Sequence, residues 1–374
     1  METIANPTSS FPPDPANADT PLEANLNALL PALTAIFAVA FFAALIDQWR
    51  ERRRAYQLIW AIGMLFFAVA AACEALAAIG GWNELLYRAW YLTGAVWTAG
   101  WLGLGTAFLL ARTRFGYAIT LSLFLAGLFT FLAARRPEYA GAGAVPLLYF
   151  IAAAALALAV AVETYFQDDR WPRFAAAAVV GATLISIGLM VTATLSAPGY
   201  ALDPVTGVPI GTILPVSLRL LTPFMNITGT FALALGALFS AYMFMPKKRV
   251  LDYSLDAGQS GDQFLFNLLI APFAITVNFL ASLPGAVRDL FGGRLHTRVP
   301  ATLLIAVGAI VVGSADTLNR FGSTGPYQLA KLLGVVLLFG GFLVSVETFR
   351  EIRVPFTHRV LRGGRRESGE LAEH

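Results

Sequence analysis

Long apolar blocks separated by short polar segments dominate the chain. Each block is about 17 to 28 residues long, which is enough helix to cross a hydrocarbon core of about 30 Å. Barrel strands alternate apolar and polar residues, so these unbroken blocks predict helices and not a β-barrel. The predicted fold is an all-α, polytopic membrane protein with about nine transmembrane helices. The clear blocks are Leu29–Ile46, Leu58–Gly80, Leu85–Ala111, Gly116–Ala134, Val145–Val162, Phe174–Leu195, Leu218–Met245, Val299–Ala315 and Tyr327–Val346.

The composition points to lipid as the main solvent of this protein. Hydrophobic residues make up 57% of the 374 positions and charged residues only 13%, whereas a soluble domain carries about 25% charged residues. Without water in the bilayer core, backbone polar groups have to be paired within helices or a closed barrel. The lipid bilayer is therefore the first expected partner, and no nucleic acid is expected as a partner.

The Lys and Arg residues in short loops predict the orientation, because such loops are retained in the cytoplasm. The opposite loops are poorer in cations, with Arg135 and Arg136 as the exception. We therefore predict a bacterial plasma-membrane protein with its N-terminus outside and its C-terminus in the cytoplasm. The loop cations that follow the first, third, fifth and seventh blocks are Arg50, Arg52, Arg53, Arg54, Arg112, Arg114, Arg170, Arg173, Lys247, Lys248 and Arg249.

One further apolar segment, Phe264–Val287, is ambiguous because it contains two prolines and two asparagines. If it crossed the membrane, the six arginines of the C-terminal tail would lie outside, against the usual charge distribution. We therefore expect a re-entrant or interfacial helix, while a tenth crossing is the alternative.

These boundaries divide the chain into five segments. Residues 1–27 are rich in proline, contain four acids and have no Lys or Arg, so they predict a disordered extracytoplasmic tail and not a signal peptide, which begins with a positive segment. A seven-helix membrane core at 28–246 precedes a cytoplasmic-side linker with the re-entrant or interfacial helix at 247–298. A two-helix membrane hairpin at 299–348 precedes a basic cytoplasmic tail at 349–374, which we expect to attract anionic lipids.

No feature of the sequence predicts a cofactor or a catalytic residue. Cys73 is the single cysteine, so there is neither a disulfide framework nor a thiolate metal cage. The three histidines lie outside the confident blocks, which argues against haem and histidine metal sites within the membrane. We therefore expect a protein that is not an enzyme and holds no cofactor or metal.

Ionisable residues inside membrane spans are costly and are candidates for function. One interpretation is an outward-facing ligand site. The other is structural pairing, in which Glu74 binds Arg88 across the short turn between their helices and the remaining cations extend to the headgroups. The five candidates at the predicted outer boundary are Glu74, Arg88, Arg219, Asp316 and Lys331.

An aromatic stripe follows the third block at spacings of three and four residues, and so lies on one helix face. Its members are Tyr87, Trp90, Gly94, Trp97 and Trp101. Trp97 and Trp101 lie deeper than the usual interfacial position of aromatic residues, so they are the candidates for the floor of a hydrophobic-ligand site. The alternative is packing between helices combined with interface anchoring.

Small residues are frequent within the blocks and predict close approach of helices. The glycines concerned are Gly100, Gly103, Gly105, Gly181, Gly188, Gly229 and Gly236.

The stretch Arg52–Leu110 carries a resemblance through its runs Trp-Ala-Ile-Gly, Gly-Gly-Trp, Tyr-Arg and Trp-Leu-Gly-Leu-Gly-Thr. It resembles a group of uncharacterised bacterial multi-pass membrane proteins from GC-rich genomes, which implies no activity. Arg52–Arg54, Trp60 and Arg88 also resemble, more weakly, the seven-helix membrane sensor region of bacterial histidine kinases. This chain has two more predicted spans and no output domain, so a sensing role would need a separate signalling partner.

Three classes of function remain. A non-catalytic scaffold that senses a ligand, or binds a lipid or another hydrophobic ligand, and acts with a partner fits the outer charges and the sensor resemblance. The alternatives are a transporter of small solutes or lipids and a structural subunit of a membrane complex. Transporters usually have polar groups near the midplane and a two-fold internal repeat. The predicted midplane is nearly bare apart from Asn226 near Pro223, and seven plus two spans do not divide into halves.

Overall fold

The computed structural model describes residues 21–166, 169–195, 213–254, 261–292, 294–320, 324–345, 352–353 and 360–362. Ten of its helices are long and apolar enough to cross a membrane, where α3, η2 and α4 count as one continuous helix. The elements are α1 (Pro21–Arg52), α2 (Ala55–Gly80), α3 (Glu84–Trp90), the π-helical segment η2 (Tyr91–Trp97), α4 (Thr98–Leu109), α5 (Gly116–Ala133), the short 3-10 turn η3 (Pro137–Tyr139), α6 (Val145–Tyr165), α7 (Trp171–Thr192), α8 (Val216–Phe244), α9 (Gly261–Phe291), α10 (Arg298–Arg320), α11 (Thr324–Val344), β1 (Ile352–Arg353) and β2 (Val360–Arg362).

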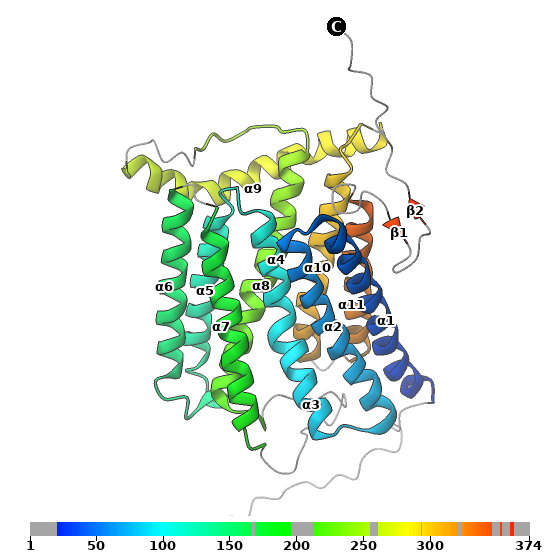
Figure 1. Ribbon diagram of the computed structural model, residues 1–374. Coiled ribbons are helices and arrows are strands. Elements are labelled where there is room, and N and C mark those ends of the chain that lie inside the picture. The colour runs from blue at the N-terminus through cyan, green and yellow to red at the C-terminus, as the bar shows by residue number, and fades with distance from the viewer. Residues whose placement is uncertain are drawn as a thin grey trace, which may run out of the picture.

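The long helices form a bundle, except α9, which lies across one end of it (Figure 1). This architecture is that of a polytopic helical membrane protein, as the apolar blocks predict. The predicted and observed helix ends agree within a few residues at most boundaries, because polar and basic residues follow each block directly.

The packing of α9 shows that both of its halves lie at the same end of the bundle. Near its start, the ring of Phe264 lies 5.9 Å from that of Tyr117 and 5.3 Å from that of Tyr165, at the start of α5 and the end of α6. Near its end, Ala286 packs with Tyr242 and Val299, at the end of α8 and the start of α10. Although α9 is long enough to cross, this arrangement agrees with the predicted interfacial helix.

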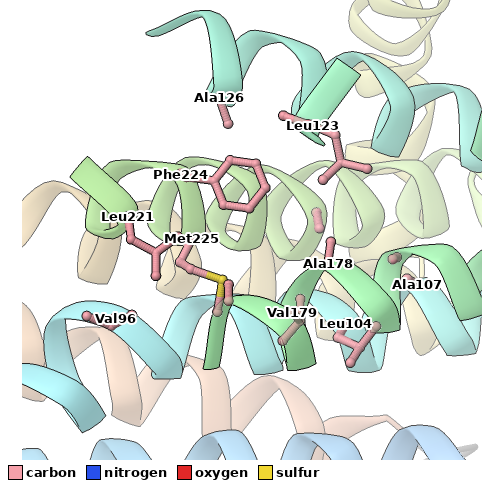
Figure 2. Packing of buried hydrophobic residues seen from close by; sticks show 14 of the residues in the cluster. Val96, Leu104, Ala107, Leu123, Ala126, Ala178, Val179, Leu221, Phe224 and Met225 are labelled. Atoms are coloured by element: carbon pink, nitrogen blue, oxygen red, sulfur yellow. The ribbon is translucent and has the colours of Figure 1, made fainter. Parts of the chain in front are cut away.

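Two clusters of buried residues hold the bundle together. The first joins α2 through α8, and Figure 2 shows Leu104, Leu123, Val179 and Met225 meeting there from α4, α5, α7 and α8. The second joins α1 and α2 to α4, α8, α10 and α11. The C-terminal helix pair is therefore packed against the first helices of the chain and is part of the bundle.

Glycine contacts bring α4 and α8 together at backbone distance. A Cβ atom on Gly229 would lie 2.1 Å from the carbonyl carbon of Ala99, and one on Gly103 would lie 2.6 Å from the carbonyl oxygen of Gly229. The prediction of close approach was wrong for Gly181 and Gly188, because a Cβ atom at either position would meet nothing within 4 Å. Gly188 lies on an exposed face of α7, which none of the described helices covers.

The two predicted tails differ in part from the structure. Helix α1 begins at Pro21, so residues 21–27 are helical although we predicted disorder there. Proline is well suited to the first turn of a helix, where its missing N–H leaves no bond unmade. In the predicted basic tail, β1 and β2 pair as a short antiparallel ladder. Residues 1–20 and most of 349–374 lie outside the described residues.

Candidate functional site: a buried polar cluster

A buried ion pair joins the last turns of α2 to the first turns of α11. Figure 1 shows these two helices side by side with α1 in the bundle. The Nζ atom of Lys331 lies 2.6 Å from Oε2 of Glu74. Both residues are buried, with exposed fractions of 7% for Lys331 and 6% for Glu74. The pair links positions 257 residues apart in the sequence, and so it ties the last long helix to the second.

The other carboxylate oxygen of Glu74 is also occupied. The indole Nε1 of Trp90 donates a hydrogen bond to Oε1 over 2.6 Å, and the hydroxyl of Tyr327 lies 3.3 Å from the same oxygen. The Lys331 ammonium also lies 5.1 Å from the centre of the Tyr327 ring. A buried charge is tolerated only when it is paired and hydrogen-bonded, and Glu74 meets that requirement with three donors.

Helix geometry explains how the cluster assembles from its elements. Tyr327 and Lys331 are four residues apart on α11, so their side chains share one helix face. Trp90 ends α3, immediately before η2. At the end of η2 the backbone N–H of Thr98, the first residue of α4, donates to the carbonyl oxygen of Thr93 five residues earlier, and the Thr98 hydroxyl donates to the same oxygen over 2.7 Å. Single π-helical turns within α-helices are frequent at functional sites. The segment η2 directly follows Trp90, which donates a hydrogen bond to Glu74.

The predicted pairing of Glu74 with Arg88 was wrong. Arg88 donates over 2.8 Å to Oε1 of Glu84, one turn earlier, and to the carbonyl oxygens of Met190 and Ala193 at the end of α7. Side chains two positions apart on an α-helix, such as those of Arg88 and Trp90, point about 200° apart around the helix axis. Because Trp90 points to Glu74, Arg88 is turned away toward α7. The cation that pairs with Glu74 is Lys331 of α11. The short turn between α2 and α3 carries no information on where α11 packs.

We expect Glu74→Gln and Arg88→Gln to destabilise the protein independently. Arg88→Gln removes charged hydrogen bonds at the end of α7, which should lower the free energy of unfolding by about 1–3 kcal/mol. Since the two residues share no partner, the effects should add within about 0.5 kcal/mol in the double variant. Reversible unfolding in mild detergent measures this, and a larger coupling energy would contradict the assignment of their partners.

Arg219 makes a contact away from this cluster. The Arg219 guanidinium lies 4.8 Å from the ring centre of Tyr139, in the turn after α5. Asp316 belongs to α10, but its side chain lies outside the described residues. Of the five residues predicted at the outer boundary, the structure therefore brings together Glu74 and Lys331.

The two deep tryptophans bind neighbouring helices. Trp97 Nε1 donates over 2.8 Å to the hydroxyl of Ser186, and Trp101 Nε1 donates over 3.1 Å to that of Thr183, both on α7. Their rings lie 4.9 and 6.0 Å from the ring of Phe66 on α2. These contacts support packing between helices, which was the alternative to a ligand-site floor.

The described residues enclose a small apolar cavity in a different place. It lies between α4, α5, α7 and α8, next to the side chains that Figure 2 shows, and its volume is about 20 Å³. Such a volume holds roughly one water molecule. Its lining includes Leu123, Val179, Met225 and Thr228 and none of the charged candidates.

Sequence reasoning missed two members of the cluster. Tyr327 carried a usable signal, because its spacing of four residues from Lys331 predicts a shared face. Trp90 was recognised only as part of the aromatic stripe.

No group of three or more His, Cys, Asp or Glu side chains that could hold a metal ion occurs among the described residues.

Comparison with known proteins identifies no relative of this chain. No protein-family model, curated protein or solved structure matches the chain.

Proposed function

We propose that this protein is a non-catalytic scaffold of a bacterial plasma membrane that acts with a separate partner protein. The N-terminus is outside and the C-terminus is in the cytoplasm in this proposal, as the loop cations favour. One observation carries it: the buried carboxylate of Glu74 is occupied on both oxygens by Lys331, Trp90 and Tyr327. A carboxylate held in this way stabilises the contact between helices and is not presented to a substrate.

The cavity supports the same proposal. Sites for small organic ligands usually enclose about 300–1,000 Å³ and combine apolar walls with a few convergent polar groups. The cavity between α4, α5, α7 and α8 measures about 20 Å³ and lies away from the charged cluster. A scaffold needs neither a large cavity nor accessible acid–base groups. The described residues therefore meet the structural requirements of this function.

Ligand sensing is the second candidate, and η2 is the observation that favours it. Trp90 precedes this π-helical segment and donates to Glu74. A change of η2 to α-helical geometry would rotate Trp90 relative to Glu74 and loosen the link between α3 and the Glu74–Lys331 pair. Such a coupling would suit a sensor that passes a signal to a partner, in keeping with the resemblance to histidine-kinase sensor regions.

Crosslinking in membranes of the native host, with the full chain tagged, tests the scaffold proposal. We expect one membrane or membrane-associated protein to crosslink in a fixed ratio and to lose stability when this chain is deleted. The matched control is another tagged multi-pass protein expressed at the same level. Solute flux or substrate turnover by the purified protein alone, reconstituted in vesicles, would contradict the proposal.

A further inference from the structure

Helix α9 has one face against the bundle and one apolar face that no described residue covers. The face against the bundle includes Phe264, Asn278, Ser282 and Ala286. The outer face is uncharged, and no Asp, Glu, Lys or Arg occurs from residue 264 to residue 287. Its large side chains, with their exposed fractions, are Phe266 (63%), Leu269 (80%), Phe273 (66%), Leu280 (57%), Val287 (50%) and Phe291 (86%).

Such a face is suited to acyl chains. Large exposed apolar patches mark protein or membrane contacts in general. Here both halves of α9 lie at the same end of a membrane-spanning bundle, and the helix lies across that end (Figure 1). Acyl chains near a membrane surface are therefore the partner that suits this face.

Two polar residues on the bundle-facing side of α9, Asn278 and Ser282, hold the basic segment that follows α8 in place. Asn278 accepts hydrogen bonds from the backbone N–H groups of Val250 and Leu251 over 2.7 and 2.9 Å, and its amide donates over 2.8 Å to the carbonyl oxygen of Leu251. The hydroxyl of Ser282 accepts from the N–H of Lys248 over 2.9 Å. These bonds fix the segment that follows α8 along α9.

The charges in the two segments beside the second half of α9 are predominantly positive. Residues 246–254 contain three cations and one acid, and residues 288–298 likewise contain three and one, so the two segments together hold six cations and two acids. Asp289 is already paired with Arg294 over 3.2 Å. The side chains of Lys248, Arg249 and Arg288 are exposed. A phosphate group at this level would meet these cations, while its acyl chains would meet the apolar face.

We propose that α9 and the adjoining basic segment form a binding site for an anionic phospholipid of the bilayer. Lys248, Arg249 and Arg288 face the headgroup phosphate, and Leu280 and Val287 contact the acyl chains. Each cation near a membrane surface attracts anionic lipid, and Asn278 and Ser282 keep the segment in place. This site is distinct from the C-terminal tail, and it does not depend on the scaffold proposal.

Binding of phosphatidylglycerol to the full-length protein in neutral detergent tests this site. We expect wild-type protein to retain phosphatidylglycerol in preference to phosphatidylcholine, as native mass spectrometry would show. The double variant Lys248→Gln/Arg249→Gln should bind phosphatidylglycerol roughly 10- to 30-fold more weakly, since two surface cations are removed. Both residues are exposed, so the variant should fold normally, and its thermal unfolding without added lipid checks this.

The control variant Arg135→Gln/Arg136→Gln removes the same charge at the opposite end of the bundle and should bind phosphatidylglycerol as wild type does. Glycerol phosphate, which carries a negatively charged phosphate group without acyl chains, should not displace the lipid at equal concentration. Equal weakening in both variants, equal retention of phosphatidylcholine, or displacement by glycerol phosphate would each overturn the proposal.

Discussion

Replacing Lys331 with methionine is expected to lower the free energy of unfolding by about 3–5 kcal/mol, because it leaves the buried Glu74 carboxylate without its cation. Glu74→Gln should have an effect of similar size, since it leaves the Lys331 ammonium buried and unpaired. Both residues are less than a tenth exposed, so water cannot replace the missing partner. Reversible unfolding of the full-length protein in mild detergent, followed by tryptophan fluorescence, measures these changes.

The double variant Glu74→Gln/Lys331→Met distinguishes a paired charge from two separate defects. It contains no unpaired charge, so its loss of stability should be smaller than the sum of the two single losses by about 0.5–3 kcal/mol. Glu84→Gln is the matched control, because it removes the same charge from the exposed pair with Arg88. Exposed pairs contribute about 0–1 kcal/mol. A strictly additive double variant would show that Glu74 and Lys331 do not interact.

The class of fold follows from the sequence because the physics of the bilayer is simple. A block such as Leu58–Gly80 has to be helical, since lipid offers no other partner for its backbone groups. The cost of translocating the tail arginines predicts an interfacial α9, and α9 lies across one end of the bundle, while the side of the membrane on which the tail lies stays a prediction. The helical start of α1 was missed because the acids and prolines of the N-terminal segment resemble those of a disordered chain.

The candidate site was only half predictable. The energetic cost of an ionisable side chain within the membrane singles out Glu74 and Lys331 from the sequence alone. Which residues pair with each other depends on which helices are neighbours. The short turn after α2 made Arg88 the obvious cation, yet the rotation of α3 turns Arg88 to α7 while α11 supplies Lys331. The sequence contains no local signal for the packing of α11 against α1 and α2, nor for the π-helical geometry of η2.

Gly229→Ala is expected to destabilise the protein by about 1–3 kcal/mol or more, because the added methyl group overpacks a closed interface. Its Cβ would lie 2.1 Å from backbone atoms of Ala99, which cannot rotate away as a side chain would. The matched control is Gly188→Ala on α7, where a Cβ meets nothing within 4 Å. Alanine is favoured over glycine within helices by about 1 kcal/mol, so this control should be neutral or slightly stabilising.

The opposite signs of these two changes separate close helix contact from helix propensity. If propensity dominated, both alanine variants would gain stability. If α4 and α8 are in backbone contact at Gly229, that variant alone should lose stability, and its unfolding midpoint should fall below that of the wild type in the same detergent. Equal midpoints for the Gly229 and Gly188 variants would contradict the contact. The expected difference between them, about 1–4 kcal/mol from the two contributions together, is well within the reach of the measurement.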